Sequence, residues 1–166
     1  MRIHLFTVLS FMLVTTLMSS AQESKASAPV LPGSQYSGMY SFLRDGEYLQ
    51  ITVEEKGHVS GFISRYEDLD SHRDIKFLTH FFKQGQIEGS KLSFTTETVH
   101  GEWFEFQGTI ERGEGKQAGD EAFYVLKGKL VHYSTDAEKK VTSRSREVAL
   151  KSFPHDLTSR PTEKKD

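Results

Sequence analysis

Apolar and polar side chains alternate in eight short runs between Tyr36 and Lys151, and the runs are rich in aromatic and β-branched residues. A period of two is typical of strands that bury one face, and no interval carries the 3.6-residue period of a helix. Three of the runs follow one another directly in the stretch from Ile75 to Arg112. The predicted strands are Tyr36–Leu43, Glu47–Glu54, His58–Tyr66, Ile75–Glu88, Lys91–Val99, Trp103–Arg112, Ala122–Tyr133 and Val141–Lys151.

The segments between the runs read as hairpin turns. Asp45-Gly46 is a strong tight-turn signal, and Glu55-Lys56-Gly57 ends in the glycine that a three-residue loop needs in the left-handed conformation. Closing this second loop sets Val53 opposite Val59, so the apolar residues of both strands share one face.

Gly89-Ser90 predicts another two-residue turn, which pairs Ile87 with Leu92 and Phe81 with Thr98. The residues that this register turns inward are Phe77, Phe81 and Ile87, and those that it turns outward are Leu78, His80 and Phe82. An outward patch of Leu78, Val99 and Trp103 would then be unusually apolar for a solvated face, so either a loop or a second subunit should cover it, and a homodimer is preferred.

Every connection fits an antiparallel neighbour, so the strands should form an up-and-down meander. An open sheet with one apolar face would leave that face wet or two edges exposed, and closure into a barrel removes both problems. Glycines inside the predicted strands would permit the necessary bends, at Gly38, Gly61, Gly85, Gly108 and Gly128. We therefore predict an all-β fold, an antiparallel up-and-down meander of about eight strands closed into a small barrel, with a β-sandwich as the alternative.

This order of a short entry followed by eight sequential strands resembles lipocalin- or avidin-type barrels over Tyr36 to Lys151. The resemblance implies a small barrel whose interior is either filled by side chains or open to one ligand. It is architectural only, because Gly101-Glu102-Trp103 does not lie at the first strand, where the lipocalin glycine-x-tryptophan belongs. No residue roles are carried over from it.

The N-terminal residues have the features of a secretory signal peptide. Arg2 precedes the apolar run Leu5–Met18, and Ser19-Ser20-Ala21 places small residues at the −3 and −1 positions. The run is short for a membrane span, so cleavage after Ala21 is preferred to an uncleaved anchor. The predicted organisation is a signal peptide at 1–21, a linker at 22–34, a single β-barrel domain at 35–152 and a disordered tail at 153–166. The mature protein should be secreted or periplasmic. It should contain no membrane span.

Composition narrows the function classes. The formal net charge of −2 argues against nucleic acid as a partner. The absence of cysteine excludes disulfides and thiolate chemistry, and favours a bacterial exported protein over a disulfide-rich eukaryotic one. The sequence contains neither a nucleophile elbow nor histidines at the spacing of a zinc site, so we expect that the protein is not an enzyme and holds no metal or cofactor.

A polar cluster in the middle of the chain has the alternation of cation ligands, at Asp68, Asp70, His72 and Asp74. The central glycine of an EF-hand loop is missing, so a solvated loop is preferred.

The last hairpin contains the candidate binding residues. If Tyr133 and Val141 close it, Leu130 faces Arg144 and Arg146 lies on the same inward face. A buried guanidinium needs an anionic partner, although both arginines could instead reach water at the barrel mouth or be turned outward by a bulge. The predicted ligand-binding residues are Arg144, Arg146, Tyr124 and His132.

The preferred function is therefore a binding module for a small, partly apolar and anionic ligand. The alternatives are a small barrel enzyme of isomerase or lyase type, and a structural or partner-binding envelope module with a filled core.

Overall fold

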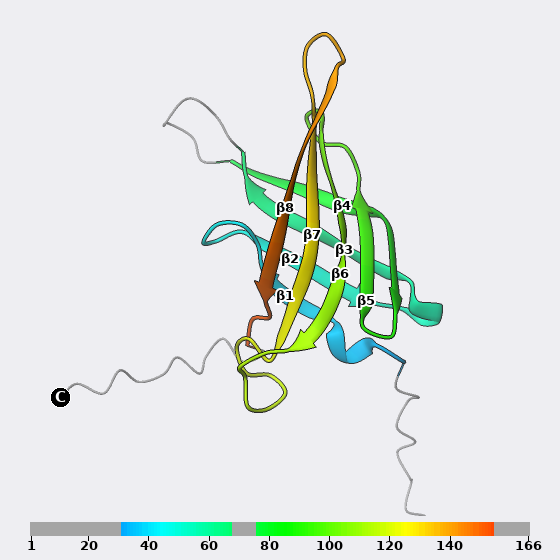
Figure 1. The fold of residues 1–166 in the computed structure, drawn as a ribbon, viewed down its shortest axis with the longest axis vertical. Helices are drawn as coiled ribbons and strands as arrows, with labels where there is room; N and C mark the ends of the chain where they lie inside the picture. The colour runs from blue at the N-terminus through cyan, green and yellow to red at the C-terminus, as the bar shows by residue number, and fades with distance from the viewer. Residues whose placement is uncertain (1–30, 68–75, 155–166) are drawn as a thin grey trace, which may run out of the picture.

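The computed structural model describes residues 31–67 and 76–154, and these form one antiparallel sheet of eight strands in sequence order (Figure 1). The predicted all-β meander is confirmed. The strands are β1 (Gly38–Ser41), β2 (Tyr48–Val53), β3 (Val59–Tyr66), β4 (Phe77–Glu88), β5 (Lys91–Thr96), β6 (Glu102–Arg112), β7 (Tyr124–Thr135) and β8 (Val141–Lys151). Two 3-10 turns, η1 (Ser34–Tyr36) and η2 (Glu55–Gly57), precede β1 and β3.

Several sequence predictions fall outside the described residues. These are the signal peptide at 1–21, most of the linker and of the tail, and the acidic cluster that includes Asp68, Asp70, His72 and Asp74.

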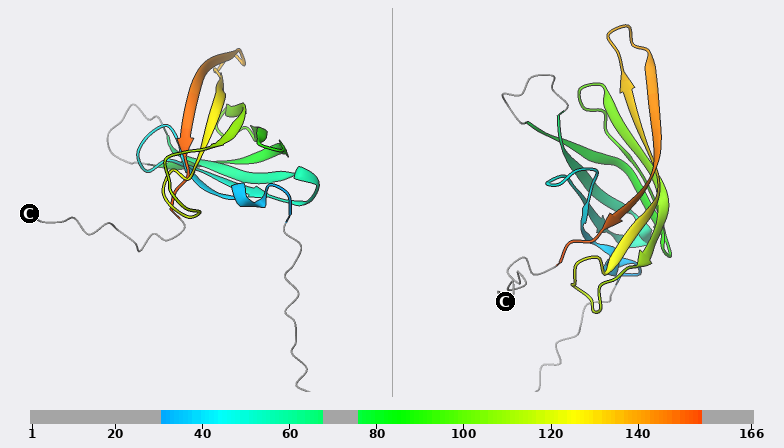
Figure 2. Two further views of the ribbon diagram at one scale, coloured as in Figure 1. Left: turned by 60° about the horizontal axis from the view of Figure 1, so that its bottom comes forward. Right: turned by 60° about the vertical axis from the view of Figure 1, so that its left-hand side comes forward.

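The sheet curls into a half-barrel whose first and last strands meet at one end (Figure 2). Tyr40 of β1 forms an isolated bridge with Ser152, and the Phe153 amide donates to the Met39 carbonyl at 2.8 Å. β1 has four residues whereas β8 has eleven, so most of β8 has no partner strand on its second edge among the described residues. The β7–β8 hairpin therefore projects beyond the other strands (Figure 1).

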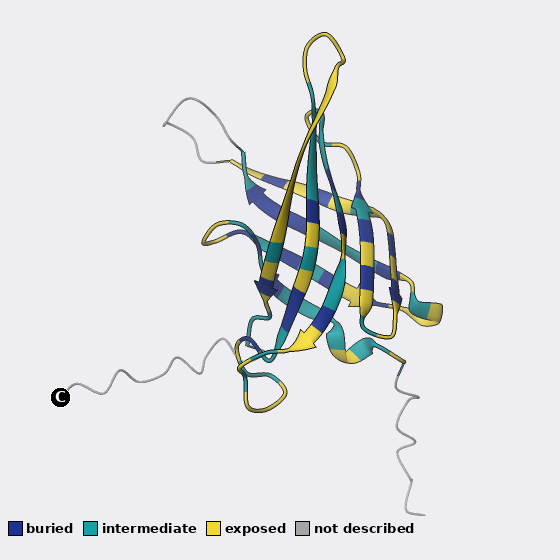
Figure 3. Cartoon of the chain, viewed as in Figure 1, coloured by how far each residue is buried: buried dark blue, intermediate teal, exposed yellow. Residues whose placement is uncertain are grey.

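Large side chains fill the concave face of the half-barrel. The residues with at most 1% of their surface exposed include Tyr40, Leu49, Ile51, Ile63, Phe104, Phe106, Leu126 and Leu130. Burying each such side chain stabilises the fold by about 1.5–3 kcal/mol relative to exposure. Figure 3 shows the resulting alternation of buried and exposed positions along each strand. The interior is consequently a packed core along most of its length.

The β2–β3 register matches the prediction, with Val53 opposite Val59, because the Glu55–Gly57 turn and the apolar alternation specify the same pairing. In the β4–β5 hairpin the pairing of Ile87 with Leu92 is also confirmed near the turn. Farther from the turn, a bulge shifts the register between Phe82 and Gln84.

This bulge reverses the faces predicted for the first half of β4. Leu78 and His80 point into the core with 9% and 0% exposure, whereas Phe77 and Phe81 lie outside with 52% and 56% exposure. The prediction that Phe81 pairs with Thr98 is wrong, because one extra residue in a strand exchanges its two faces.

Because of the same reversal, the three residues of the predicted dimer patch do not lie on one outward face. Leu78 is buried, so it cannot share an outward surface with Val99 and Trp103. Trp103 instead stacks on Tyr133 with ring centroids 4.9 Å apart, and Val99 forms a bridge with Glu102.

In the β7–β8 hairpin the register differs from the prediction by two residues. Arg144 lies opposite His132 and Arg146 lies opposite Leu130. A shift of two residues leaves every side chain on its predicted face, so both arginines lie on the inner face as expected.

Close contact between β6 and β7 depends on the cross-strand pair Gly108 and Gly128. A Cβ atom on Gly108 would overlap the Lys127 carbonyl oxygen and lie 2.8 Å from the Gly128 Cα.

We predict that Gly108→Ala lowers the free energy of unfolding by about 1–3 kcal/mol, because neither backbone group can move aside without disturbing the strand pairing. Urea unfolding measures this change, with Thr109→Ala in the same strand as the control, expected within ~0.5 kcal/mol of the parent. Equal midpoints for the two variants would contradict the steric role.

Candidate functional site

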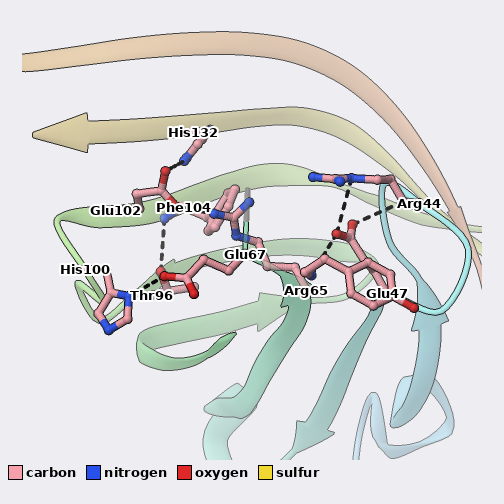
Figure 4. A network of polar contacts seen from close by, with 10 residues as sticks. Arg44, Glu47, Arg65, Glu67, Thr96, His100, Glu102, Phe104 and His132 are labelled. Atoms are coloured by element: carbon pink, nitrogen blue, oxygen red, sulfur yellow. Dashed lines mark hydrogen bonds and ion pairs between the residues drawn. The ribbon is translucent and has the colours of Figure 1, made fainter. Parts of the chain in front are cut away.

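A polar cavity of about 180 Å³ lies on the inner face where β7 and β8 run past the ends of β1–β3. Its lining residues are Leu43, Arg44, Glu47, Arg65, Phe104, His132, Arg144 and Arg146. Four guanidinium groups and a single carboxylate thus surround this inner cavity. Figure 4 shows much of the network around it.

Glu47 connects the β1–β2 turn to the end of β3. Its carboxylate is 2% exposed and accepts hydrogen bonds from the backbone amides of Tyr66 at 3.0 Å and Arg44 at 3.2 Å. The Arg44 Nε atom lies 3.5 Å from the same carboxylate. Local donors therefore satisfy this buried charge, as a carboxylate in a dry environment requires.

Arg65 lies at the centre of the network and is only 5% exposed. Its guanidinium forms an ion pair with the carboxylate of Glu102 on β6, and its Cζ atom lies 5.6 Å from the centroid of the Phe104 ring. The second oxygen of Glu102 lies 3.5 Å from His132 Nε2 (Figure 4). One carboxylate therefore joins β3, β6 and β7.

Phe104 forms the aromatic floor of the cluster. The His132 ring stacks on it with centroids 4.6 Å apart and planes 12° from parallel. The Phe104 amide donates to Thr96 Oγ1 at 3.0 Å, which ties β6 to the end of β5. The phenyl ring is thereby held in place beneath the charged groups.

His80 is the buried neighbour of this cluster. It is fully buried and meets the Phe104 ring edge to face, with centroids 5.2 Å apart. Burial, and next the positive charge of Arg65, lower the pKa of His80 to about 4. The backbone of Glu97 offsets part of this effect, although neither ring nitrogen makes a well-formed hydrogen bond in the described part of the chain. His80 is therefore neutral at pH 7.

Arg144 and Arg146 lie on the inner face of β8 but remain exposed to water. Neither forms an ion pair with any residue in the described ranges. Both arginines therefore reach water at the mouth of the half-barrel, which is one of the two alternatives to a buried position. They do so because β8 extends beyond its short neighbour β1.

The structure brings together three of the four predicted site residues. Arg144, Arg146 and His132 line the inner cavity, but Tyr124 does not. Tyr124 lies eight residues from His132 on β7, about 27 Å along an extended strand, and packs against Tyr36 at 5.0 Å.

Sequence reasoning missed Arg44, Glu47, Arg65, Glu102 and Phe104. A signal for two of them was present, because Glu47 and Arg65 continue the inward alternation of Leu49 and Ile63. The ion pair of Arg65 with Glu102 has no such signal, since 37 residues separate the partners.

No protein-family model matches this chain, and no curated protein matches it. Within the described ranges, no helix has the length and apolar character needed to cross a membrane. The same ranges contain no group of three or more histidine, aspartate or glutamate side chains placed to hold a metal ion.

We predict that His80 makes the fold acid-sensitive. The unfolded chain binds a proton at this histidine below pH 6.5, whereas the folded protein binds it only near pH 4. The stabilisation is therefore complete above pH 6.5 and is lost as the pH falls towards 4, by on the order of 3 kcal/mol. Urea unfolding across this range should show a shallower pH dependence for His80→Phe than for the parent.

The matched control is His100→Gln, because the His100 side chain is 64% exposed and hydrogen-bonds Glu67 at 2.9 Å. This variant should keep the steep acid dependence of the parent. A His80→Phe curve that parallels the parent would contradict the assignment.

Proposed function

We propose that this protein is a non-catalytic binding module for a small anionic ligand that occupies the inner cavity. The observation that carries the proposal is the pair of Arg144 and Arg146, which line this cavity and form no ion pair in the described ranges, whereas Arg44 and Arg65 are paired with Glu47 and Glu102. An anion would form charge-assisted hydrogen bonds there, which are stronger than those between neutral groups.

The acids near the cavity are already engaged. Glu47 accepts backbone hydrogen bonds, and Glu102 pairs with Arg65 and approaches His132. Arg144 and Arg146 have no acidic partner in the described ranges, so an incoming anion does not have to displace one. Their exposure gives such a ligand a route from solvent.

Cavity size restricts the ligand further. A volume of about 180 Å³ corresponds to about six water molecules, at ~30 Å³ each. The packed core beneath Phe104 excludes a long acyl chain, so the apolar part should be short and should lie against Leu43 and Phe104. A carboxylate with a few carbon atoms has the charge and size that these walls favour.

We predict that titration calorimetry detects binding of short carboxylates such as butyrate and not of the neutral alcohol 1-butanol. Arg144→Gln and Arg146→Gln should each weaken carboxylate binding about tenfold, the equivalent of ~1.4 kcal/mol. The affinity should also fall as salt is added, because the contacts are partly exposed. Lys127→Gln is the matched control, since it removes a positive charge that pairs with Glu111 away from the cavity, and it should bind like the parent.

Equal binding of acid and alcohol, or binding of neither, would overturn the anion-binding function. The packed core would then favour the alternative of a structural or partner-binding module. A homodimer stays a prediction within that alternative. Its outward apolar side chains would be Phe77 and Phe81, not Leu78.

Export is the second part of the proposal. It is supported by Arg2, the apolar run Leu5–Met18 and the small residues before Gln22. We predict that the mature protein begins at Gln22 and is secreted or periplasmic, and N-terminal sequencing of protein from its own host measures this. Retention of Met1 on protein from the cytoplasm would be the contrary result.

A further inference from the structure

The outer face of β4–β7 carries a cavity of about 640 Å³. A second cavity of about 550 Å³ adjoins it and shares Lys83, Thr95 and Glu105 with it. We call the two together the outer groove. Its outward-pointing lining residues are His58, Lys83, Gln84, Gln86, Ser93, Thr95, Glu97, Thr98, Trp103, Glu105, Gln107, Lys129, Val131 and Tyr133.

The bulge in β4 lies at this groove. β4 pairs with β3 up to Phe81 and with β5 from Phe82, and the register shifts between Phe82 and Gln84. Bulges bend a strand and increase its twist. Lys83 lies at this bend and lines both cavities, so the groove depends on backbone geometry and not on side-chain rotamers alone.

Two aromatic rings form one wall of the outer groove. Trp103 and Tyr133 are cross-strand partners whose planes are 4° from parallel at 4.9 Å. The Tyr133 hydroxyl donates to Glu105 Oε2 at 3.1 Å, and this hydrogen bond raises the pKa of Tyr133, so the phenol remains protonated. Tyr133 covers one face of the indole, and Trp103 also lines the second cavity.

The polar side chains of the outer groove supply many donors and acceptors without a net charge. Gln84 and Gln107 each present an amide with both functions, and the hydroxyls of serine and threonine add more. The Gln86 amide is partly engaged, because its Nε2 atom donates to the Lys56 carbonyl at 3.2 Å. Two lysines balance two glutamates in the lining. This balance differs from the inner cavity, where guanidinium groups predominate.

We infer that the outer groove is a second binding site, independent of the inner cavity, for an uncharged oligosaccharide. Sugar rings present C–H groups that stack on an aromatic ring, and hydroxyls that pair with planar amides and carboxylates. The charge balance disfavours phosphorylated or sulfated ligands, and the density of polar groups disfavours a purely apolar one. The volume of the larger cavity lies within the ~300–1,000 Å³ typical of small-molecule sites.

Trp103 is the single tryptophan of the chain, so its fluorescence reports directly on the outer groove. The probes are cellohexaose, maltohexaose and an N-acetylglucosamine hexamer, titrated to about 10 mM, which detects dissociation constants up to the millimolar range. We expect a saturable change in Trp103 emission with at least one of them, together with heat in calorimetry. Gln107→Ala should weaken binding of that sugar about fivefold or more, which corresponds to ~1 kcal/mol for a lost hydrogen bond.

Gln50→Ala is the matched control, because Gln50 lies on β2 and lines neither cavity of the outer groove. It should bind like the parent, and so should Arg144→Gln, which alters only the inner cavity. Each variant should unfold at the parental urea midpoint, since the substituted side chains are not buried.

Three results would overturn this inference. The first is the absence of both fluorescence change and heat with every neutral probe. The second is an equal loss of affinity in Gln107→Ala and Gln50→Ala, because the sugar would then bind elsewhere. The third is tighter binding of adenosine monophosphate or of a sulfated oligosaccharide than of the neutral sugars.

Discussion

The unequal length of the first and last strands is the constraint on which the rest of this structure depends. Four residues of β1 cannot pair with eleven residues of β8, so the half-barrel closes at one end and stays open at the other. At the closed end, apolar side chains pack without access to water. At the open end, water reaches the inner face, and charged side chains can lie there without the cost of full desolvation.

The polar cluster at the open end joins strands that are not neighbours in the sheet. Arg65 on β3 reaches Glu102 on β6, and Glu102 approaches His132 on β7. Removing one partner of such a buried pair generally costs more than the pair contributes, because the remaining charge is left in a poorly solvated site. His80 lies beneath it as a neutral ring, so acid would add a positive charge beside Arg65. The cluster thus links β3, β6 and β7 across the curled sheet.

The two faces of the same sheet present different chemistry to solvent. The inner cavity is small, positively charged and floored by Phe104. The outer groove is larger, balanced in charge and bordered by the Trp103–Tyr133 stack. β6 and β7 contribute alternate residues to both, so Phe104 and His132 face inward while Trp103 and Tyr133 face outward. One pair of strands therefore lines both proposed sites, which lie on opposite faces of the sheet and need not compete.

The sequence by itself determined the strands, the turns and the faces of β2, β3, β7 and β8, because these follow from local alternation and from glycine in tight turns. The β7–β8 register was misjudged by two residues, yet Arg144 and Arg146 kept their face, since side chains repeat every second position. The tertiary structure alone decided the bulge before Gln84, which buried Leu78 and His80 and exposed Phe77 and Phe81. A bulge is favoured by the curvature of the whole sheet, and the pairing of Arg65 with Glu102 depends on how strands distant in sequence approach one another, so neither leaves a pattern in neighbouring residues.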